Sequence, residues 1–93
     1  MKIKMNTQDY LTLTASVDQG QHCYNFIINT YNNHGETERM SHVESLWLPM
    51  LRKIDETVVE DDLAEESHPA QLLLAVMEMV AHDTCQLAYA VQN

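Results

Sequence analysis

Residues 10–31 read YLTLTASVDQGQHCYNFIINTY, and the choice between strand and helix here sets the class of the whole chain. Apolar and polar side chains alternate over 10–17, which is the period of a half-buried strand. A DQGQ turn at 18–21 follows, and the alternation resumes over 22–31. If the turn sets Asp18 opposite Gln21, the apolar residues of both strands share one face of an antiparallel hairpin. The facing pairs are then Ala15 with Tyr24, Leu13 with Phe26, and Leu11 with Ile28.

The alternative for the same stretch is a helix through residues 8–31. Its apolar residues also recur at heptad-like spacing, at Tyr10, Leu13, Val17, Tyr24, Ile27 and Tyr31. The hairpin is favoured, because Gly20 and the many Thr, Asn, Tyr and Ile residues are poor helix formers. Residues 2–5, KIKM, alternate as well and predict a short third strand with Ile3 and Met5 facing inward.

The remainder of the chain predicts two helices after a loop at 32–36. Ser41 and Glu44 have the spacing of a capping box, which predicts the start of the first helix. From Val43 to Val58 apolar residues recur every three to four positions, as on one face of an amphipathic helix. Pro49 interrupts this pattern and predicts a kink, or a helix that begins near Leu48.

The second helix, from Ser67 or His68 to Gln92, has Pro69 in its first turn and is apolar around most of its circumference. The hairpin and the first helix would bury it from two sides, or a second copy of the chain would cover it. The predicted fold is therefore α+β, a single domain over residues 1–93 in which the N-terminal hairpin packs on two C-terminal helices. An all-α three-helix bundle is the alternative.

Composition limits the class of protein. Ninety-three residues with 45% apolar content and only two Gly and two Pro predict one folded domain with a core. No stretch has the length of a membrane span or the pattern of a signal peptide, so the expected location is the cytoplasm. Cys23 and Cys85 lie far apart and outside any CxxC pair, which favours reduced thiols; a single bridge between them is the alternative.

Net charge is confined to the C-terminal part of the chain. The five acids and five bases of residues 1–53 balance, whereas residues 54–93 carry nine carboxylates and no Lys or Arg, giving the formal net charge of −9. Seven of the nine acids lie within positions 55–66, which we call the acidic segment. Unmixed charge of this kind repels itself and attracts basic partners.

The chain has none of the motifs that mark common catalytic or cofactor sites. There is no P-loop, GxGxxG, GxSxG, HExxH or EF-hand loop. His82, Asp83 and Cys85 are close in sequence, but on a helix these positions do not converge on one metal ion. The carboxylates of the acidic segment are too densely placed to be buried, as a general acid requires. We therefore expect no enzyme activity, no cofactor and no metal site.

The acidic segment carries the functional hypothesis. Closely spaced carboxylates resemble the phosphates of a nucleic-acid strand in charge density, so a surface that binds DNA would accept them. The alternative is a solvated acidic face that serves solubility, although such faces normally mix both signs. The expected partner is a basic nucleic-acid-binding protein, a nuclease or defence complex, and direct binding of nucleic acid is not expected. The candidate contact residues are Asp55, Glu56, Glu60, Asp61, Asp62, Glu65 and Glu66.

In size, acidity and lack of catalytic motifs the chain resembles the small inhibitors of phages and mobile elements, which include anti-CRISPR, anti-restriction and nuclease-immunity proteins. The resemblance is compositional and assigns no residue a role. A dimeric chaperone or adaptor that holds a client on its apolar C-terminal helix is the alternative function, and an antitoxin is a third. For the chaperone, and for a homodimer, the candidate contact residues are Leu72, Leu74, Val76, Met77 and Met79.

Overall fold

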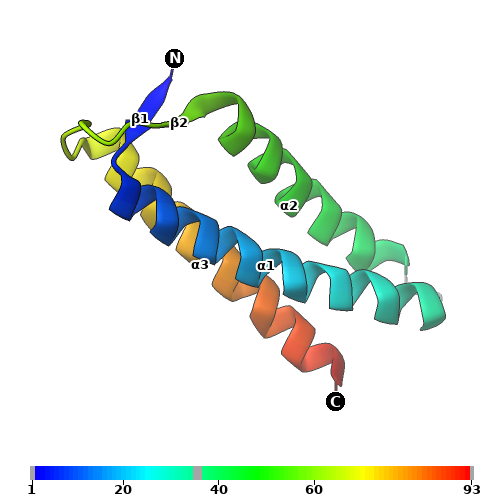
Figure 1. Ribbon diagram of the computed structural model, residues 1–93. Coiled ribbons are helices and arrows are strands. Elements are labelled where there is room, and N and C mark those ends of the chain that lie inside the picture. Colours follow the sequence, from blue (N-terminus) through cyan, green and yellow to red (C-terminus); the bar gives the residue numbers. More distant parts are fainter. Residues whose placement is uncertain (1, 35–36, 93) are drawn as a thin grey trace.

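The computed structural model describes residues 2–34 and 37–92, and the side chains of residues 2–30 and 44–90. Three long helices and two short strands make up the described part of the chain (Figure 1). In chain order they are β1 (Ile3–Met5), α1 (Thr7–His34), α2 (Thr37–Thr57), β2 (Val58–Glu60) and α3 (His68–Gln92).

The predicted antiparallel hairpin is wrong, because α1 runs without interruption through residues 10–31. The alternative, a bundle of three helices, is close to the observed architecture. Asn6 caps α1, its side-chain oxygen accepting a hydrogen bond from the Asp9 N–H at 2.8 Å. The hydroxyl groups of Thr12 and Thr14 donate to carbonyls of the preceding helical turn, so threonine is accommodated within the helix. Tertiary packing of one helical face has overridden the low helix propensity of this stretch.

The two strands form a parallel pair between segments that are far apart in the sequence. Ile3 pairs with Val58, Lys4 with Val59 and Met5 with Glu60. The prediction of a strand at residues 2–5 is confirmed, with Met5 buried and Ile3 half-buried, but its partner is β2 instead of a hairpin. Parallel strands need a long crossover, which α1 and α2 provide here.

The boundaries of the C-terminal helices differ in part from the predicted ones. α2 begins at Thr37, so Ser41 lies within the helix and the predicted start there is wrong. Pro49 is also inside α2, which excludes a helix that begins near Leu48. α3 has the predicted extent, and Ser67 caps it by accepting a hydrogen bond from the Ala70 N–H at 3.3 Å. Of the predicted loop at 32–36, residues 32–34 belong to α1 and the other two lie outside the described residues.

α1 and α3 lie side by side and run in the same direction (Figure 1). Asp9 accepts a hydrogen bond from the Gln71 side chain at 3.1 Å, and fourteen residues later in both helices Cys23 forms a disulfide bond with Cys85. The interpretation of these cysteines as reduced thiols is wrong for this structure, and the alternative of a single bridge is confirmed. Sequence spacing does not show the pairing, because only the packing of α1 on α3 brings the two Cα atoms within 5.1 Å.

α2 returns along α1, and the two helices approach closely at Gly20. A Cβ atom added to Gly20 would lie only 2.2 Å from the ring of Trp47, so a glycine is required for this approach. The Trp47 indole N–H donates to the Gln21 side chain at 2.9 Å, and the ring stacks on Tyr24 at a centroid distance of 6.4 Å. Burial, reinforced by the nearby Glu44 carboxylate, raises the pKa of Tyr24 above its usual value of 10.0.

The core lies mainly between α1 and α3, with contributions from β1 and α2. Its members share almost complete removal from solvent. They are Met5, Leu13, Tyr24, Ile27, Trp47, Ala70, Leu74, Met77, Val80, Ala81 and Ala88. The described chain is elongated, with principal extents of 48, 22 and 16 Å. Its radius of gyration is 14.7 Å, against about 12 Å for a compact domain of this length.

Candidate functional site

The acidic segment lies at the end of the molecule that carries the β1–β2 sheet (Figure 1). Asp55 and Glu56 occupy the last turn of α2, and Glu60 ends β2. The remaining four carboxylates belong to the connection from β2 to α3. All seven are exposed except Asp61, which is half-buried. The fold therefore brings the predicted contact residues to one end of an elongated molecule.

Hydrogen bonds from β1 and the start of α1 hold this segment in place. The Asp61 N–H donates to the Met5 carbonyl at 2.8 Å, which extends the parallel pairing by one residue. The Lys2 ammonium donates to the Glu56 carbonyl at 2.6 Å, at the C-terminal end of α2 where a positive charge is favourable. The Thr7 hydroxyl donates to the Asp62 carboxylate. The carboxylates thus project from a backbone that is tied to the rest of the fold.

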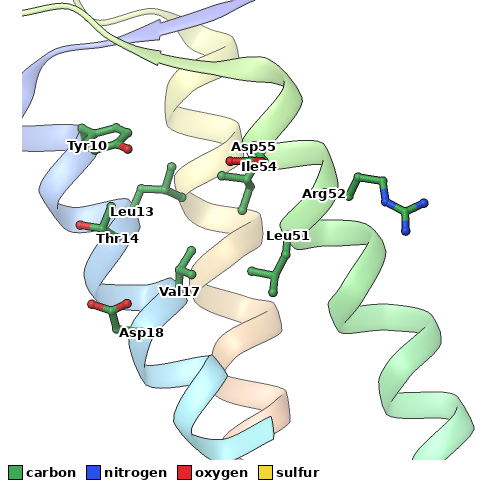
Figure 2. A pocket seen from close by; sticks show the side chains of 9 residues that line it. All are labelled: Tyr10, Leu13, Thr14, Val17, Asp18, Leu51, Arg52, Ile54 and Asp55. Carbon is green, nitrogen blue, oxygen red and sulfur yellow. The ribbon is translucent and has the colours of Figure 1, made fainter. Parts of the chain in front are cut away.

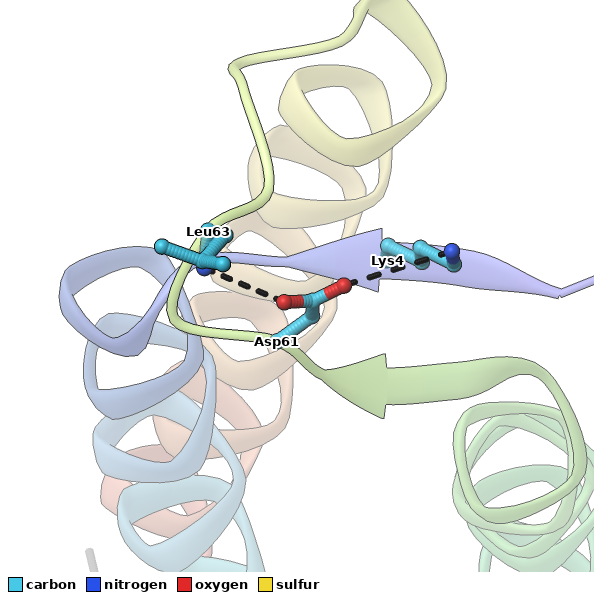
Figure 3. A network of polar contacts seen from close by, with 3 residues as sticks. All are labelled: Lys4, Asp61 and Leu63. Carbon is cyan, nitrogen blue, oxygen red and sulfur yellow. Dashed lines mark hydrogen bonds and ion pairs between the residues drawn. The ribbon is translucent and has the colours of Figure 1, made fainter.

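Asp61 organises the turn that follows β2 (Figure 3). One oxygen of its carboxylate accepts a hydrogen bond from the Leu63 N–H at 3.0 Å, and the other lies 4.0 Å from the Lys4 ammonium. Its carbonyl accepts from the Ala64 N–H at 2.9 Å. The turn leaves the Leu63 side chain 91% exposed in the middle of the acidic segment. Because the Lys4–Asp61 pair is also exposed, it adds little to stability.

Lys2 and Lys4 lie beside the acidic segment, a position that the sequence does not predict. They belong to the charge-balanced N-terminal part, and the parallel pairing of β1 with β2 brings them there. The alternation of lysine with Ile3 and Met5 was the available signal, because it puts both charges on the face opposite the buried residues. Among the side chains that the structure describes, Lys4–Asp61 is the one ion pair, so the two lysines leave most of the acidic charge unpaired.

The residues proposed for self-association do not form one surface. Leu74 and Met77 belong to the core, Val76 is half-buried, and Leu72 and Met79 are exposed on α3. The helix is covered by α1 on one side, so its apolar circumference is divided between the core and the solvent. A partner could reach only the exposed part of this set without opening the core.

A cleft of about 510 Å³ separates the first half of α1 from the second half of α2. Figure 2 shows it open toward the viewer, with α3 behind the two helices. We call it the α1–α2 cleft. Tyr10, Leu13, Val17, Leu51 and Ile54 supply its apolar lining, and Thr14, Asp18, Arg52 and Asp55 its polar lining. A second hollow, of about 370 Å³, lies between β1 and the segment that leads into α3.

In the part of the chain with described side chains, no three His, Cys, Asp or Glu residues are grouped as metal ligands. The helices of the described residues include none that is long and apolar enough to cross a membrane. Comparisons with family models, with curated proteins and with solved structures give no significant match.

Proposed function

We propose that this protein is a small inhibitor that binds the basic nucleic-acid-binding surface of another protein and catalyses no reaction. One observation carries the proposal. Six carboxylates of the acidic segment are exposed at one end of the molecule, with no basic side chain in ion-pair contact among the described residues. A nuclease or a defence complex that binds DNA or RNA has the lysines and arginines to neutralise them.

The arrangement of the acidic segment supports this function in two further ways. Its carboxylates come from a helix end, a strand, a turn and a linker, so they extend over a surface instead of along one helical face. Backbone hydrogen bonds to β1 hold that surface, which lowers the entropy lost when a partner binds. The exposed Leu63 adds an apolar contact at its centre, and the charges around it favour fast, salt-sensitive association.

Two double variants test the proposal, because they change net charge equally at different places. E65K/E66K reverses two exposed carboxylates of the acidic segment, and E78K/D83K reverses two exposed carboxylates of α3. The wild type and both variants are immobilised and incubated with host lysate, with and without double-stranded DNA as competitor. We expect the wild type and E78K/D83K to retain a partner that DNA displaces, and E65K/E66K to lose it.

Circular dichroism shows whether both variants keep the helical content of the wild type, so that a loss of binding is not a loss of folding. Retention of the same partner by E65K/E66K in 0.5 M salt would refute the proposed function. Retention that DNA does not displace would refute the mimicry of nucleic acid.

The other functions predicted from the sequence have less support. A chaperone or adaptor that holds a client on α3 would need Leu74 and Met77, but their side chains are buried in the core. The exposed Leu72 and Met79 remain available to it. An antitoxin or immunity protein would use the acidic segment in the same way as the proposed inhibitor, because a toxic nuclease also has a basic surface.

We place the proposed function in the cytoplasm, as the sequence predicts, where reducing thiols act on the Cys23–Cys85 bond. This bond joins α1 to α3, whereas hydrogen bonds with Lys2 and β1 hold the acidic segment. We therefore expect the reduced protein to keep the arrangement of its carboxylates and to bind the same partner. The same lysate experiment in the presence of dithiothreitol tests this point.

A further inference from the structure

The α1–α2 cleft is an apolar surface bounded at both ends by contacts of the fold. At one end the Gly20–Trp47 contact brings the two helices together, and at the other β2 pairs with β1. Between these points α2 diverges from α1 (Figure 1). The cleft is therefore a defined opening in the structure, with a volume of about 510 Å³.

Exposed leucines extend the apolar surface beyond the cleft on both helices. Leu11, 59% exposed, precedes Thr14 by three residues and Asp18 by seven on α1. Leu48, 44% exposed, precedes Arg52 by four residues on α2. Helix geometry places residues at these spacings on one face, so each rim of the cleft combines a leucine with a charged residue. An apolar patch with a polar border is typical of a surface that another protein covers.

The charges of the two rims have opposite signs. Figure 2 shows Asp18 on the outer side of α1 and Arg52 on the outer side of α2, pointing away from each other. A two-fold axis that runs along the cleft would set α1 of one copy over α2 of a second copy. Asp18 of each copy would then face Arg52 of the other. The outer rims of two copies are thus complementary in charge, whereas Asp55, which also lines the cleft, gains no basic partner in this arrangement.

We propose that the α1–α2 cleft is the interface of a homodimer in which a second copy of the chain covers the apolar lining. This interface is separate from the acidic segment of the proposed function, apart from Asp55, and stands or fails independently of it. A partner with basic residues on both rims would be repelled by Arg52, and one with acidic residues by Asp18. A second copy would place an acidic residue near Arg52 and a basic residue near Asp18.

Closed symmetry also favours this arrangement over insertion of α3 from another copy. α3 lies behind the cleft in Figure 2, so cleft and α3 face in different directions. Contacts between two different surfaces generate open chains of molecules unless the rotation closes. The described chain measures 48 Å by 22 Å in its two larger extents, so a face that includes the cleft and its rims has room for the roughly 800 Å² per partner that a standard interface buries.

The two-fold axis along the cleft has a consequence for the acidic segments. Because corresponding ends of the two copies then lie together, both acidic segments come to the same end of the dimer. Their repulsion opposes association, and added salt screens it. Added salt weakens this repulsion and also the attraction between Asp18 and Arg52, so its net effect on dimerisation does not test the interface. Exchange of the two rim charges does.

Sedimentation velocity of the full chain over a range of concentrations tests the proposal. The wild type is expected to dimerise, and Asp18→Arg or Arg52→Asp alone to weaken dimerisation about tenfold or more, through like charges at the interface. The double variant D18R/R52D is expected to restore it, because the two charges exchange places. Asp83→Arg, a reversal of the same charge on α3, is the matched control and leaves the dimer unchanged.

Far-ultraviolet circular dichroism establishes that each variant is folded before its mass is interpreted. Leu48→Glu, at an exposed position, is the second variant and is expected to give a folded monomer. A wild type that stays monomeric at all concentrations overturns the proposal. So does a dimer that resists both single reversals, or a double variant that remains as weak as the singles.

Discussion

The contacts of α1 with α3 and with α2 are built differently, and the difference shows which part of the fold is self-sufficient. α1 and α3 pack along their length, from the Asp9–Gln71 hydrogen bond to the Cys23–Cys85 disulfide. α1 and α2 approach closely at Gly20 and Trp47 and diverge from there toward the strands, where the cleft lies. α1 and α3 therefore form the more extensively packed unit, while α2 is positioned by Trp47, by partly buried Met50, Leu51 and Ile54, and by the β1–β2 pairing.

The largest effect is expected from removing the covalent tie between α1 and α3. The double variant C23S/C85S should unfold at lower urea concentration, with a loss of about 2–4 kcal/mol, because the bond closes a loop of 62 residues. Urea unfolding of oxidised wild type, reduced wild type and the variant measures this loss. Reduced wild type and C23S/C85S should have the same free energy of unfolding, because both lack the bond. Equal stability of all three would show that packing alone holds α1 to α3.

A smaller effect is expected at the contact between α1 and α2. Gly20→Ala improves helix propensity by about 1 kcal/mol, but the added Cβ would displace the Trp47 ring. We expect a net loss of about 1–3 kcal/mol, in the range of other overpacked sites. Trp47 is the only tryptophan, so its fluorescence follows this contact directly during unfolding.

The matched control is Gln19→Ala, an exposed position next to Gly20 on α1. It should be neutral or slightly stabilising, because alanine favours the helix and nothing opposes it there. If Gly20→Ala changed stability no more than this control, the ring of Trp47 would have room to move. A glycine would then not be required at position 20.

The smallest effect is expected from titrating Tyr24, which stacks on Trp47. Its pKa is raised in the folded protein by burial and then by Glu44, so the folded state holds the phenol proton more tightly than the unfolded state. The stability from this group is full below pH 10.0, the unfolded value, and is lost as the pH rises through the folded pKa.

Thermal unfolding of wild type and Tyr24→Phe between pH 8 and 11 measures the contribution of Tyr24. The wild type should lose stability more steeply above pH 10, while the variant lacks this component. Tyr89→Phe, at a mostly exposed tyrosine of α3, should keep the alkaline loss of the wild type. An identical alkaline loss in Tyr24→Phe would contradict the assignment to Tyr24.

The sequence predicted α3 and the strand at residues 2–5, because Pro69 and the alternation of Ile3 and Met5 are local signals. It failed at residues 10–31, where Leu11, Leu13, Ala15 and Val17 alternate as in a strand. In the helix, Leu13, Val17, Gly20, Tyr24 and Ile27 lie on one face instead. That face packs on α3 and on Trp47, which is 27 positions from Gly20, and local propensity cannot include contacts so distant in the sequence.

The acidic segment was also only partly predictable. Its charge is evident in the sequence, whereas its position at one end of the molecule follows from the parallel pairing of β1 with β2. The apolar spacing from Val43 to Val58 predicts one helix, so the sequence offers no strand at 58–60 to pair with residues 2–5. Lys2 and Lys4 reach the segment through the same pairing, and their proximity was missed with it.

The Cys23–Cys85 bond has one more consequence, for the fate of the chain under attack by proteases. The two cysteines are 62 positions apart, and the stretch between them contains all of α2 and β2 and more than half of α3. A single backbone cleavage anywhere in this span leaves the two pieces joined through sulfur. Under oxidising conditions a nicked molecule would therefore keep its full mass, and only a reducing agent would release the fragments.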